Sequence, residues 1–381
     1  MNDSSFLLDN YRRFPVKLVG GRGSILFGSD GREYIDLAAG VGVNVFGVCD
    51  EGWIDAVTRQ LCRIQHTSNS FYSLPAEDLA RELCTRTGMK KAFFSNSGAE
   101  ANEAALKAAR KYSSEKKGKE YTNIITVNMS FHGRTIATLS ASGQDVMHDG
   151  FYPLTPGFVY CDDDPEMLCR LAEEHKTAAI MIETIRGEGG VVPLSAEFIR
   201  TAADIAKKED ILLIVDEVQT GNGRCGALYS YMNFGIEPDI VTTAKGLGGG
   251  LPIGATLFGG KTEKTLGYGT HGSTFGGNPV ACAGALYVLS RLNDELFSEV
   301  REKSKYVFSS LSGAKGITDV SGAGLMIGIK TEKSADEVLA SCREKGVLAI
   351  KAKDKIRLLP ALNIPLDLLQ KGIEMIKEAC G

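Results

Sequence analysis

The sequence lacks the features that mark several large classes of protein. It has no apolar run long enough to span a bilayer. Its first residues show neither a basic start nor a long apolar stretch, so no secretory signal is expected. Its nine cysteines include no Cys-x-x-Cys pair, so neither a metal site nor a disulfide framework is expected. Its 43 Lys and Arg do not outnumber its 47 Asp and Glu, which argues against nucleic-acid binding. These absences favour a cytoplasmic globular protein with reduced cysteines and no membrane partner.

Glycine, by contrast, is abundant and clustered. The 44 glycines gather around positions 40–47, 187–190, 246–254 and 269–277. Glycine is used where the backbone turns with positive φ or lies close against a ligand. Clusters between apolar strands therefore favour loops built around a bound molecule, although any single cluster could be an ordinary turn.

Short apolar runs alternate with helix-like stretches along most of the chain. The strands are predicted at 92–94, 124–127, 178–182, 211–215 and 240–241, with helices at 99–112 and 196–207. Such alternation predicts an α/β fold with a mostly parallel, doubly wound sheet. Ligands bind beyond the carboxyl ends of strands in these sheets. The segments that follow the strands are therefore the candidate site: 95–100, 128–135, 183–190, 216–221 and 242–250.

The last part of the chain changes character. One long helix is predicted at 286–311, followed by Gly/Ser breaks, short strands and a final helix at 366–379. This pattern favours a smaller α+β domain. The expected division is an N-terminal segment 1–54 that contributes to the small domain, a large domain 55–286, and a C-terminal small domain 287–381.

The segment Ser97-Gly98-Ala99 lies at a strand-to-helix junction. Ser97 and Glu100 fit a capping box, and an Ala-rich helix follows at once. The free N–H groups and positive dipole end of such a helix form an anion site suited to a phosphate. Many helices begin in this way, so the pattern alone does not require a phosphate.

Asp216 and Lys245 each follow an apolar strand. A partly buried carboxylate at Asp216 needs a partner, and a protonated pyridine nitrogen would serve; a helix cap and a metal ligand remain alternatives. Burial would lower the pKa of Lys245, and a neutral amine can form an imine. The loop after Lys245 has Leu251 where a dinucleotide-binding loop would have its third glycine, which weakens a nicotinamide interpretation.

Taken together, these motifs resemble those of the class III, or ornithine-type, aminotransferases of fold type I. The resemblance covers essentially the whole chain in the expected order. The matching segments are Asp30-Gly-Arg-Glu-Tyr-Ile-Asp36, Ala39-Gly-Val-Gly42, Ser97-Gly-Ala-Glu-Ala-Asn-Glu103, Phe131-His-Gly-Arg-Thr135, Gly187-Glu-Gly-Gly190, Asp216-Glu-Val-Gln-Thr-Gly221, Ala244-Lys-Gly246 and Ser273-Thr-Phe-Gly-Gly-Asn-Pro279.

This resemblance implies a pyridoxal 5'-phosphate (PLP) enzyme with residues in defined roles. Lys245 would carry the cofactor as a Schiff base and shuttle protons, and Asp216 would pair with the pyridine nitrogen. Thr274 would reach the phosphate of a neighbouring subunit, which implies a homodimer with shared active sites. The remaining cofactor contacts would come from Ser97, Gly98 and Ala99 at the phosphate, Phe131 and Val218 at the ring faces, Gln219 near the phenolic oxygen, and His132.

The resemblance also implies how two substrates share one site. Arg134 would bind the carboxylate distal to the reacting amine, and Arg357 the α-carboxylate of glutamate or 2-oxoglutarate, because a guanidinium suits a carboxylate. Glu188 would cover Arg357 when an ω-amine reacts, since a buried unpaired charge is costly. Ser273 is also expected at the substrate.

The implied reaction is ping-pong transamination, with N-acetylornithine as the expected donor and arginine biosynthesis as the expected setting. Compact length and the Phe-His-Gly-Arg-Thr segment favour this donor. Ornithine, succinylornithine, 4-aminobutyrate and acetyl-lysine are alternatives, as are an aminomutase, an inactive PLP-binding relative and a nicotinamide dehydrogenase. Two departures from the family pattern flank the site: Asp50-Glu51, and Thr184 with Arg186.

Overall fold

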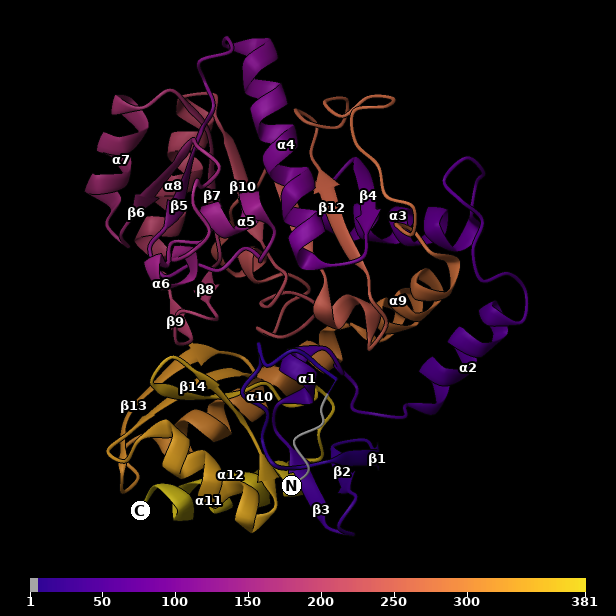
Figure 1. Ribbon diagram of the computed structural model, residues 1–381, viewed down its shortest axis with the longest axis vertical. Coiled ribbons are helices and arrows are strands. Elements are labelled where there is room, and N and C mark those ends of the chain that lie inside the picture. Colours follow the sequence, from indigo (N-terminus) through magenta and orange to yellow (C-terminus); the bar gives the residue numbers. More distant parts are fainter. Residues whose placement is uncertain (1–5) are drawn as a thin grey trace.

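A seven-stranded sheet forms the centre of the computed structural model, which describes residues 6–381 (Figure 1). All neighbouring strands are parallel except β12, which runs antiparallel to both of its neighbours. This arrangement confirms the predicted mostly parallel sheet, and it adds β6 and β12 to the predicted strands. The order is β4 (Lys91–Ser95), β12 (Gly254–Phe258), β11 (Ile240–Thr243), β10 (Leu212–Asp216), β7 (Thr177–Ile182), β5 (Asn123–Val127) and β6 (Phe158–Cys161).

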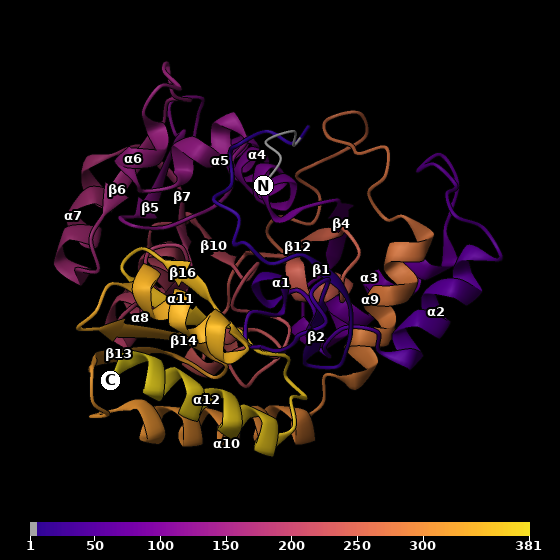
Figure 2. The same ribbon diagram turned by 60° about the horizontal axis from the view of Figure 1, so that its bottom comes forward.

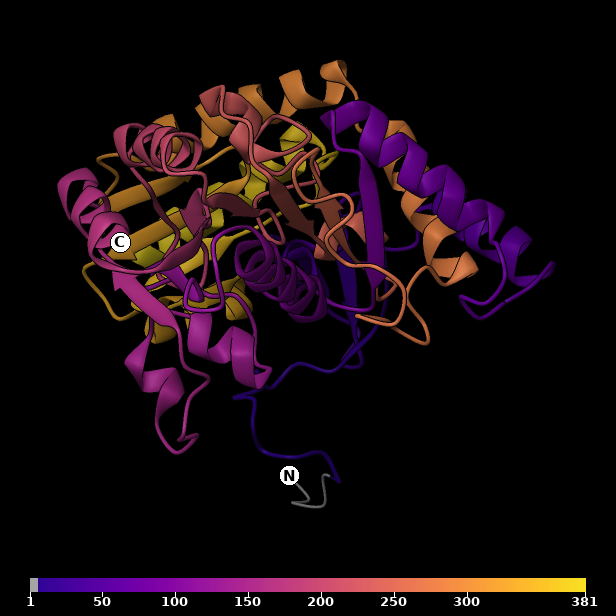
Figure 3. The same ribbon diagram turned by 90° about the horizontal axis from the view of Figure 1, so that it is seen from above.

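Helices cover both faces of this sheet, with α4 on one face and α8 on the other (Figure 3). Every residue of β7 and of β10 is buried, as expected for central strands without polar alternation. The helices of this part of the chain are α3 (Leu74–Thr87), α4 (Gly98–Lys116), α5 (Ile136–Ala141), α6 (Asp145–His148), α7 (Pro165–Glu174), α8 (Ala196–Lys208) and α9 (Pro279–Arg291).

The start of α4 differs in one respect from the expected capping box. The Ser97 hydroxyl accepts a hydrogen bond from the Glu100 N–H at 3.2 Å, as predicted. The Glu100 carboxylate, however, accepts from the N–H of Asn96 at 2.9 Å instead of returning to that of Ser97. The reciprocal half of the box was therefore wrong, because the carboxylate reaches one residue further back along the chain.

A second, antiparallel sheet lies below the first in Figures 1 and 2. Its strands are β13 (Ile317–Ala323), β14 (Met326–Thr331), β17 (Lys355–Leu358) and β16 (Ile350–Ala352). Helices α10 (Asp294–Leu311) and α11 (Ala335–Lys345) both contact α12 (Leu366–Cys380) beside it. This confirms the smaller α+β part and the final helix.

The single helix predicted at 286–311 was wrong. The structure has α9 and α10 there, separated at Leu292, whose φ of −79° and ψ of 88° are not helical. Asn293 then caps α10, because its side chain accepts from the Leu296 N–H at 2.9 Å. Asn293 and the acidic residues after it are a helix-start signal that outweighed the apolar periodicity.

The N-terminal strands join the C-terminal part of the chain. β1 (Leu18–Arg22), β2 (Ile25–Gly28) and β3 (Glu33–Asp36) form a sheet that β15 (Val347–Leu348) completes by pairing with β3. The expected domain boundaries at 54/55 and 286/287 fall inside α2 (Glu51–Leu61) and α9, which pack against each other. Between β3 and α2 lies the short α1 (Ala39–Gly42).

Several short elements connect these parts. They are β8 (Ile185–Arg186), β9 (Val192–Pro193) and two 3₁₀ helices, η1 (Ser230–Phe234) and η2 (Lys245–Gly248). All nine cysteines are free thiols. Within residues 6–381, no helix combines the length and the apolar character needed to cross a membrane.

Candidate active site

A cavity of about 400 Å³ opens at the carboxyl ends of the central strands. Each of the five segments predicted to follow a strand contributes to its wall. They supply residues 96–99, residues 131–134, Glu183, Asp216 with Val218 and Gln219, and Ala244 with Lys245. The fold thus gathers parts of the chain that lie as much as 210 residues apart, from Val43 to Ile253, around one space.

Lys245 is the first residue of η2, just after β11, and it lines this cavity. Its backbone is in the left-handed region, with φ of 45°, which is uncommon for a residue with a side chain. Burial lowers the pKa of Lys245, against the opposing effects of Glu188 and Asp216. A lowered pKa increases the neutral fraction of the amine, and only the neutral amine is nucleophilic.

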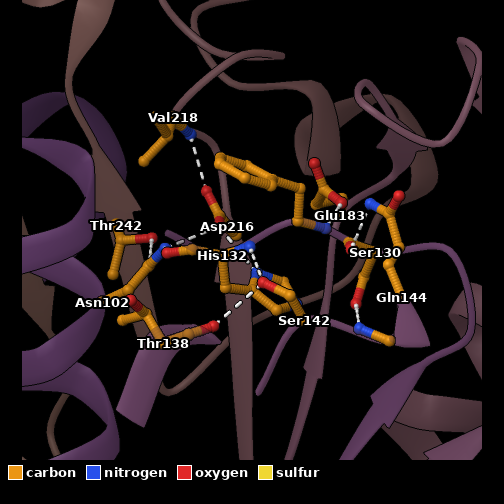
Figure 4. Close-up of polar contacts among 12 residues, drawn as sticks. Asn102, Ser130, His132, Thr138, Ser142, Gln144, Glu183, Asp216, Val218 and Thr242 are labelled. Atoms are coloured by element: carbon orange, nitrogen blue, oxygen red, sulfur yellow. Dashed lines mark hydrogen bonds and ion pairs between the residues drawn. The ribbon is translucent and has the colours of Figure 1, made fainter. Parts of the chain in front are cut away.

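The Asp216 carboxylate is held by three donors at the end of β10 (Figure 4). Its Oδ2 accepts from the Asn102 amide and lies against His132 Nδ1, each at 2.8 Å. Its Oδ1 accepts from the Val218 N–H at 3.0 Å. Only 3% of Asp216 is exposed, so these contacts replace the lost water and fix the direction of the carboxylate.

Asn102 and Thr242 form a layer behind Asp216 that sequence reasoning missed. Thr242 donates its hydroxyl to the Asn102 Oδ1 at 2.7 Å, which leaves the Asn102 amide nitrogen to donate to Asp216 and to the His132 carbonyl (Figure 4). Asn102 is 1% exposed and Thr242 is fully buried. The available signal for Asn102 was an asparagine, a weak helix former, in the first turns of α4.

Two further ionisable groups lie beside Asp216. Burial opposes the charged form of His132, but the hydrogen bond and the charge of Asp216 outweigh it and raise the pKa of His132. Burial raises the pKa of Glu183 to about 7, although His132 acts in the opposite direction. One Glu183 oxygen accepts from the Phe131 N–H at 2.9 Å, which fixes the turn that carries Phe131 and His132 (Figure 4).

Glu188, Gln219 and Arg357 form a polar group next to the cavity. The Arg357 Nη1 lies 2.5 Å from a Glu188 oxygen and 3.1 Å from the Gln219 Oε1. Arg357 is 4% exposed, and its Nε has no hydrogen-bond acceptor among the described residues. Burial disfavours the ionised Glu188, but Arg357 outweighs it and lowers the pKa of Glu188. Gln219 lines the cavity and connects this ion pair to it.

The start of α4 forms one end of the cavity. The N–H groups of Gly98 and Ala99 lie in the first turn, where a helix offers them no acceptor. A Cβ on Gly98 would lie 2.6 Å from the Val218 side chain, so any larger residue would have to displace Val218. Phe131 and Val218 are both half-buried in the cavity wall.

Three predicted site residues lie at the edge of the Lys245 cavity or outside it. Arg134 is exposed, with its guanidinium carbon 5.5 Å from the centre of the Phe131 ring. Ser273 accepts from the Asn96 amide at 3.2 Å and lines a separate surface cavity of about 480 Å³. Thr274 lines that second cavity and is exposed, so this chain does not bring it to its own Lys245 cavity.

These features fit one cofactor chemistry. A lysine of lowered pKa, a fixed buried carboxylate and the free N–H groups of a helix start suit the aldehyde, the pyridine nitrogen and the phosphate of PLP, respectively. The site is that of a PLP enzyme.

The family follows from comparison with known proteins. Residues 7–380 match the family described as Aminotransferase class-III, and the chain belongs to this family. It is thus a PLP-dependent transaminase.

Individual relatives span almost the whole chain. The acetylornithine aminotransferase of Haemophilus ducreyi is 43% identical over 99% of this chain and 96% of its own length. The acetylornithine aminotransferase of Methanocaldococcus jannaschii is 41% identical over 99% of this chain and 96% of its own length. The solved ornithine aminotransferase of Toxoplasma gondii has a TM-score of 0.93 and 32% identity, over 98% and 92%. The solved N-acetylornithine aminotransferase of Stenotrophomonas maltophilia has a TM-score of 0.84 and 34% identity, over 97% of this chain and 96% of its own length.

Proposed function

We propose that this transaminase moves the ω-amino group of N-acetylornithine to 2-oxoglutarate. The products are N-acetylglutamate 5-semialdehyde and glutamate, as a step of arginine biosynthesis. The bacterial and archaeal relatives that carry this activity in their names, at about 40% identity over the full length, support the choice of donor.

The observation that carries this proposal is the pairing of Glu188 with the buried Arg357. With glutamate or 2-oxoglutarate, an α-carboxylate sits beside the reacting centre and can take Arg357 as its partner. With an ω-amine no carboxylate is there, and Arg357 would be left buried and unpaired. The Glu188 carboxylate supplies the missing charge, so one site serves both half-reactions.

Lys245 and Asp216 carry the chemistry of each half-reaction. When bound, PLP supplies an electron-poor ring that stabilises the charge left when the substrate carbon loses its proton. Asp216 keeps a proton on the ring nitrogen through charge pairing. Lys245 takes the proton from the substrate carbon as a general base and returns it as a general acid.

The remaining predicted residues would hold and orient the cofactor and the substrate. Ser97, Gly98 and Ala99 offer the α4 N-terminus to the phosphate. Phe131 and Val218 would contact the two faces of the cofactor ring, Gln219 would lie near its phenolic oxygen, and His132, which contacts Asp216 at 2.8 Å, would support that carboxylate. Exposed Arg134 takes the α-carboxylate of N-acetylornithine, which lies far from the reacting amine, and Ser273 contacts the substrate near Asn96.

The same proposal includes a cytoplasmic homodimer with shared sites. Thr274 would complete the phosphate site of a second copy, which is consistent with its exposure and its distance from the Lys245 cavity of its own chain. Free thiols at all nine cysteines are consistent with a reducing compartment. The division into segment 1–54, domain 55–286 and domain 287–381 also stays part of the proposal.

The visible absorbance of the PLP-loaded protein tests the proposal. N-acetylornithine, added without a keto acid, should bleach the cofactor band at far lower concentration than ornithine, and 2-oxoglutarate should restore it. Ornithine is the comparison because the T. gondii ornithine aminotransferase shares the fold at a TM-score of 0.93. A stronger response to ornithine, succinylornithine, 4-aminobutyrate or acetyl-lysine would overturn the donor. Catalysis without 2-oxoglutarate would point to an aminomutase.

A further inference from the structure

The side chain of Asn222 reaches the backbone immediately before Lys245. Its amide nitrogen donates to the Ala244 carbonyl at 3.1 Å and to the Thr243 hydroxyl at 3.0 Å. Both hydrogens of that amide are therefore used, one on each of the two residues that precede the lysine. Asn222 lies in the loop that follows Asp216, so it joins the two strand ends that carry the proposed catalytic pair.

Asn222 is placed for this contact by an unusual backbone. Its φ is 56°, in the left-handed region that asparagine tolerates better than most residues. The residue is 1% exposed, and its Oδ1 is buried without a hydrogen-bond partner among the described residues. An unpartnered buried oxygen is costly. The orientation of the Asn222 side chain therefore satisfies its amide nitrogen while leaving its Oδ1 without a hydrogen bond.

The backbone that Asn222 holds is also strained. Lys245 has a φ of 45°, a conformation that costs energy for any residue other than glycine and persists only where its surroundings enforce it. Gly246 is packed closely on the other side: a Cβ there would lie 3.3 Å from that of Asn222 and 2.7 Å from the Val45 side chain. The Ala244 carbonyl and Gly246 thus fix the two peptide planes around Lys245.

We propose that Asn222 is a positioning residue for Lys245: its amide fixes the Ala244–Lys245 peptide and so sets the direction from which the ε-amino group reaches the substrate carbon. This rests on the proposed proton-transfer role of Lys245. Asn222 does not line the cavity, so it acts on the proton transfer through the lysine and contributes little to binding of substrate or cofactor.

Two substitutions distinguish the effect of the Asn222 amide from the effect of its backbone conformation. Asn222→Gly keeps the left-handed conformation at no steric cost and removes both hydrogen bonds. Asn222→Asp keeps the shape and removes the donor. Asn233→Ala is the matched control, because the Asn233 amide also donates to a backbone carbonyl, that of Cys225 at 3.3 Å, but holds no residue of the proposed catalytic pair.

The experiment uses PLP-loaded enzyme, glutamate and glutamate deuterated at the α-carbon, in single-turnover half-reactions. For Asn222→Gly we expect the limiting rate constant of the half-reaction to fall by about 10- to 100-fold with little change in the half-saturating glutamate concentration, because misplacing a reacting group by 1 Å can cost this much. The deuterium isotope effect should rise, since proton transfer becomes more rate-limiting. Asn222→Asp should show the same rise, and Asn233→Ala should match the wild type.

The outcomes are distinguishable. An unchanged isotope effect in both Asn222 variants, with or without a lower melting temperature, would overturn the proposal and leave Asn222 a structural loop residue. If Asn222→Gly does not fold, Asn222→Asp alone decides. A wild-type enzyme that does not react with glutamate would instead overturn the proposed function.

Discussion

The Glu188 carboxylate lies 2.5 Å from the Arg357 guanidinium, although the two residues are 169 positions apart in the chain. The pair joins the loop after β8 to strand β17, so it connects the two main parts of the fold at the cavity. Gln219 contacts both partners, which places the pair within reach of the space in front of Lys245. Under the proposed function, Arg357 is a positive group that exchanges Glu188 for a substrate carboxylate during the reaction.

Replacing Glu188 should therefore affect the two half-reactions unequally. In Glu188→Gln the charge of Arg357 has no partner when N-acetylornithine reacts, so we expect that half-reaction to slow by at least about tenfold. The glutamate half-reaction should change little, because the substrate carboxylate neutralises Arg357. Stopped-flow absorbance of each half-reaction measures both rates.

A control for this variant is an ion pair whose basic partner, Lys355, lies on the same strand as Arg357. Lys355 pairs with Asp319 at 2.8 Å, two residues from Arg357, so Asp319→Asn removes a neighbouring ion pair without touching the cavity. It should slow neither half-reaction. Equal losses in both half-reactions of Glu188→Gln would show that Glu188 does not act as an exchangeable partner.

Asn102 offers a test of the support behind Asp216. Asn102→Ala removes a hydrogen bond to a buried carboxylate, worth about 1.5–3 kcal/mol, so the dissociation constant of PLP should rise by about 10- to 100-fold. Equilibrium titration of the apoenzyme with PLP measures this constant. Wild-type affinity in a folded Asn102→Ala protein would mean that His132 and Val218 suffice to hold Asp216.

The sequence allowed the main sheet and the positions of Asp216 and Lys245 at neighbouring strand ends to be predicted, because both depend on local patterns. Uninterrupted apolar runs mark β7 and β10, and Asp216 and Lys245 stand where such runs end. Asn102, Thr242 and Asn222 could not be found in this way. Their contacts join residues 140 and 22 positions apart, and such pairings depend on how helices and loops settle on the sheet. The break between α9 and α10 was readable at Asn293, but helical periodicity on both sides concealed it.

Glu217, the neighbour of Asp216, should make stability depend on pH. It is fully buried, its carboxylate accepts from Thr220 at 2.6 Å and from the Tyr231 N–H at 2.7 Å, and burial raises its pKa from 4.5 to about 7. Between these two pH values the folded chain binds more protons than the unfolded chain. The free energy of unfolding therefore falls as pH rises through this window and levels off above pH 7.

Glu217→Gln cannot titrate and should lose this contribution. Relative to the wild type, the free energy of unfolding of Glu217→Gln should rise by about 2 kcal/mol between pH 5 and pH 8. Denaturant titration at each pH measures this difference. Glu302→Gln, at an exposed position of α10, controls for loss of a surface charge. Parallel pH profiles for wild type and Glu217→Gln would contradict the account of Glu217.

Mixed subunits test the shared site. Lys245→Ala lacks the lysine, and Thr274→Glu should repel the phosphate bound by the partner subunit, so each homodimer should be inactive. After random exchange, half of the dimers are mixed and each has one intact site, which predicts recovery of about a quarter of wild-type activity. No recovery, despite confirmed subunit exchange, would place Thr274 outside the partner's site.

The most direct test of the central claim is to reduce the PLP-loaded protein with sodium borohydride and locate the label by peptide mass spectrometry. A Schiff base reduced in this way becomes a stable covalent bond between the cofactor and its lysine. We predict a single labelled peptide, the one that contains Lys245. A label on a different lysine, or none on a protein that has bound PLP, would contradict the assignment of Lys245 and with it the proposed mechanism.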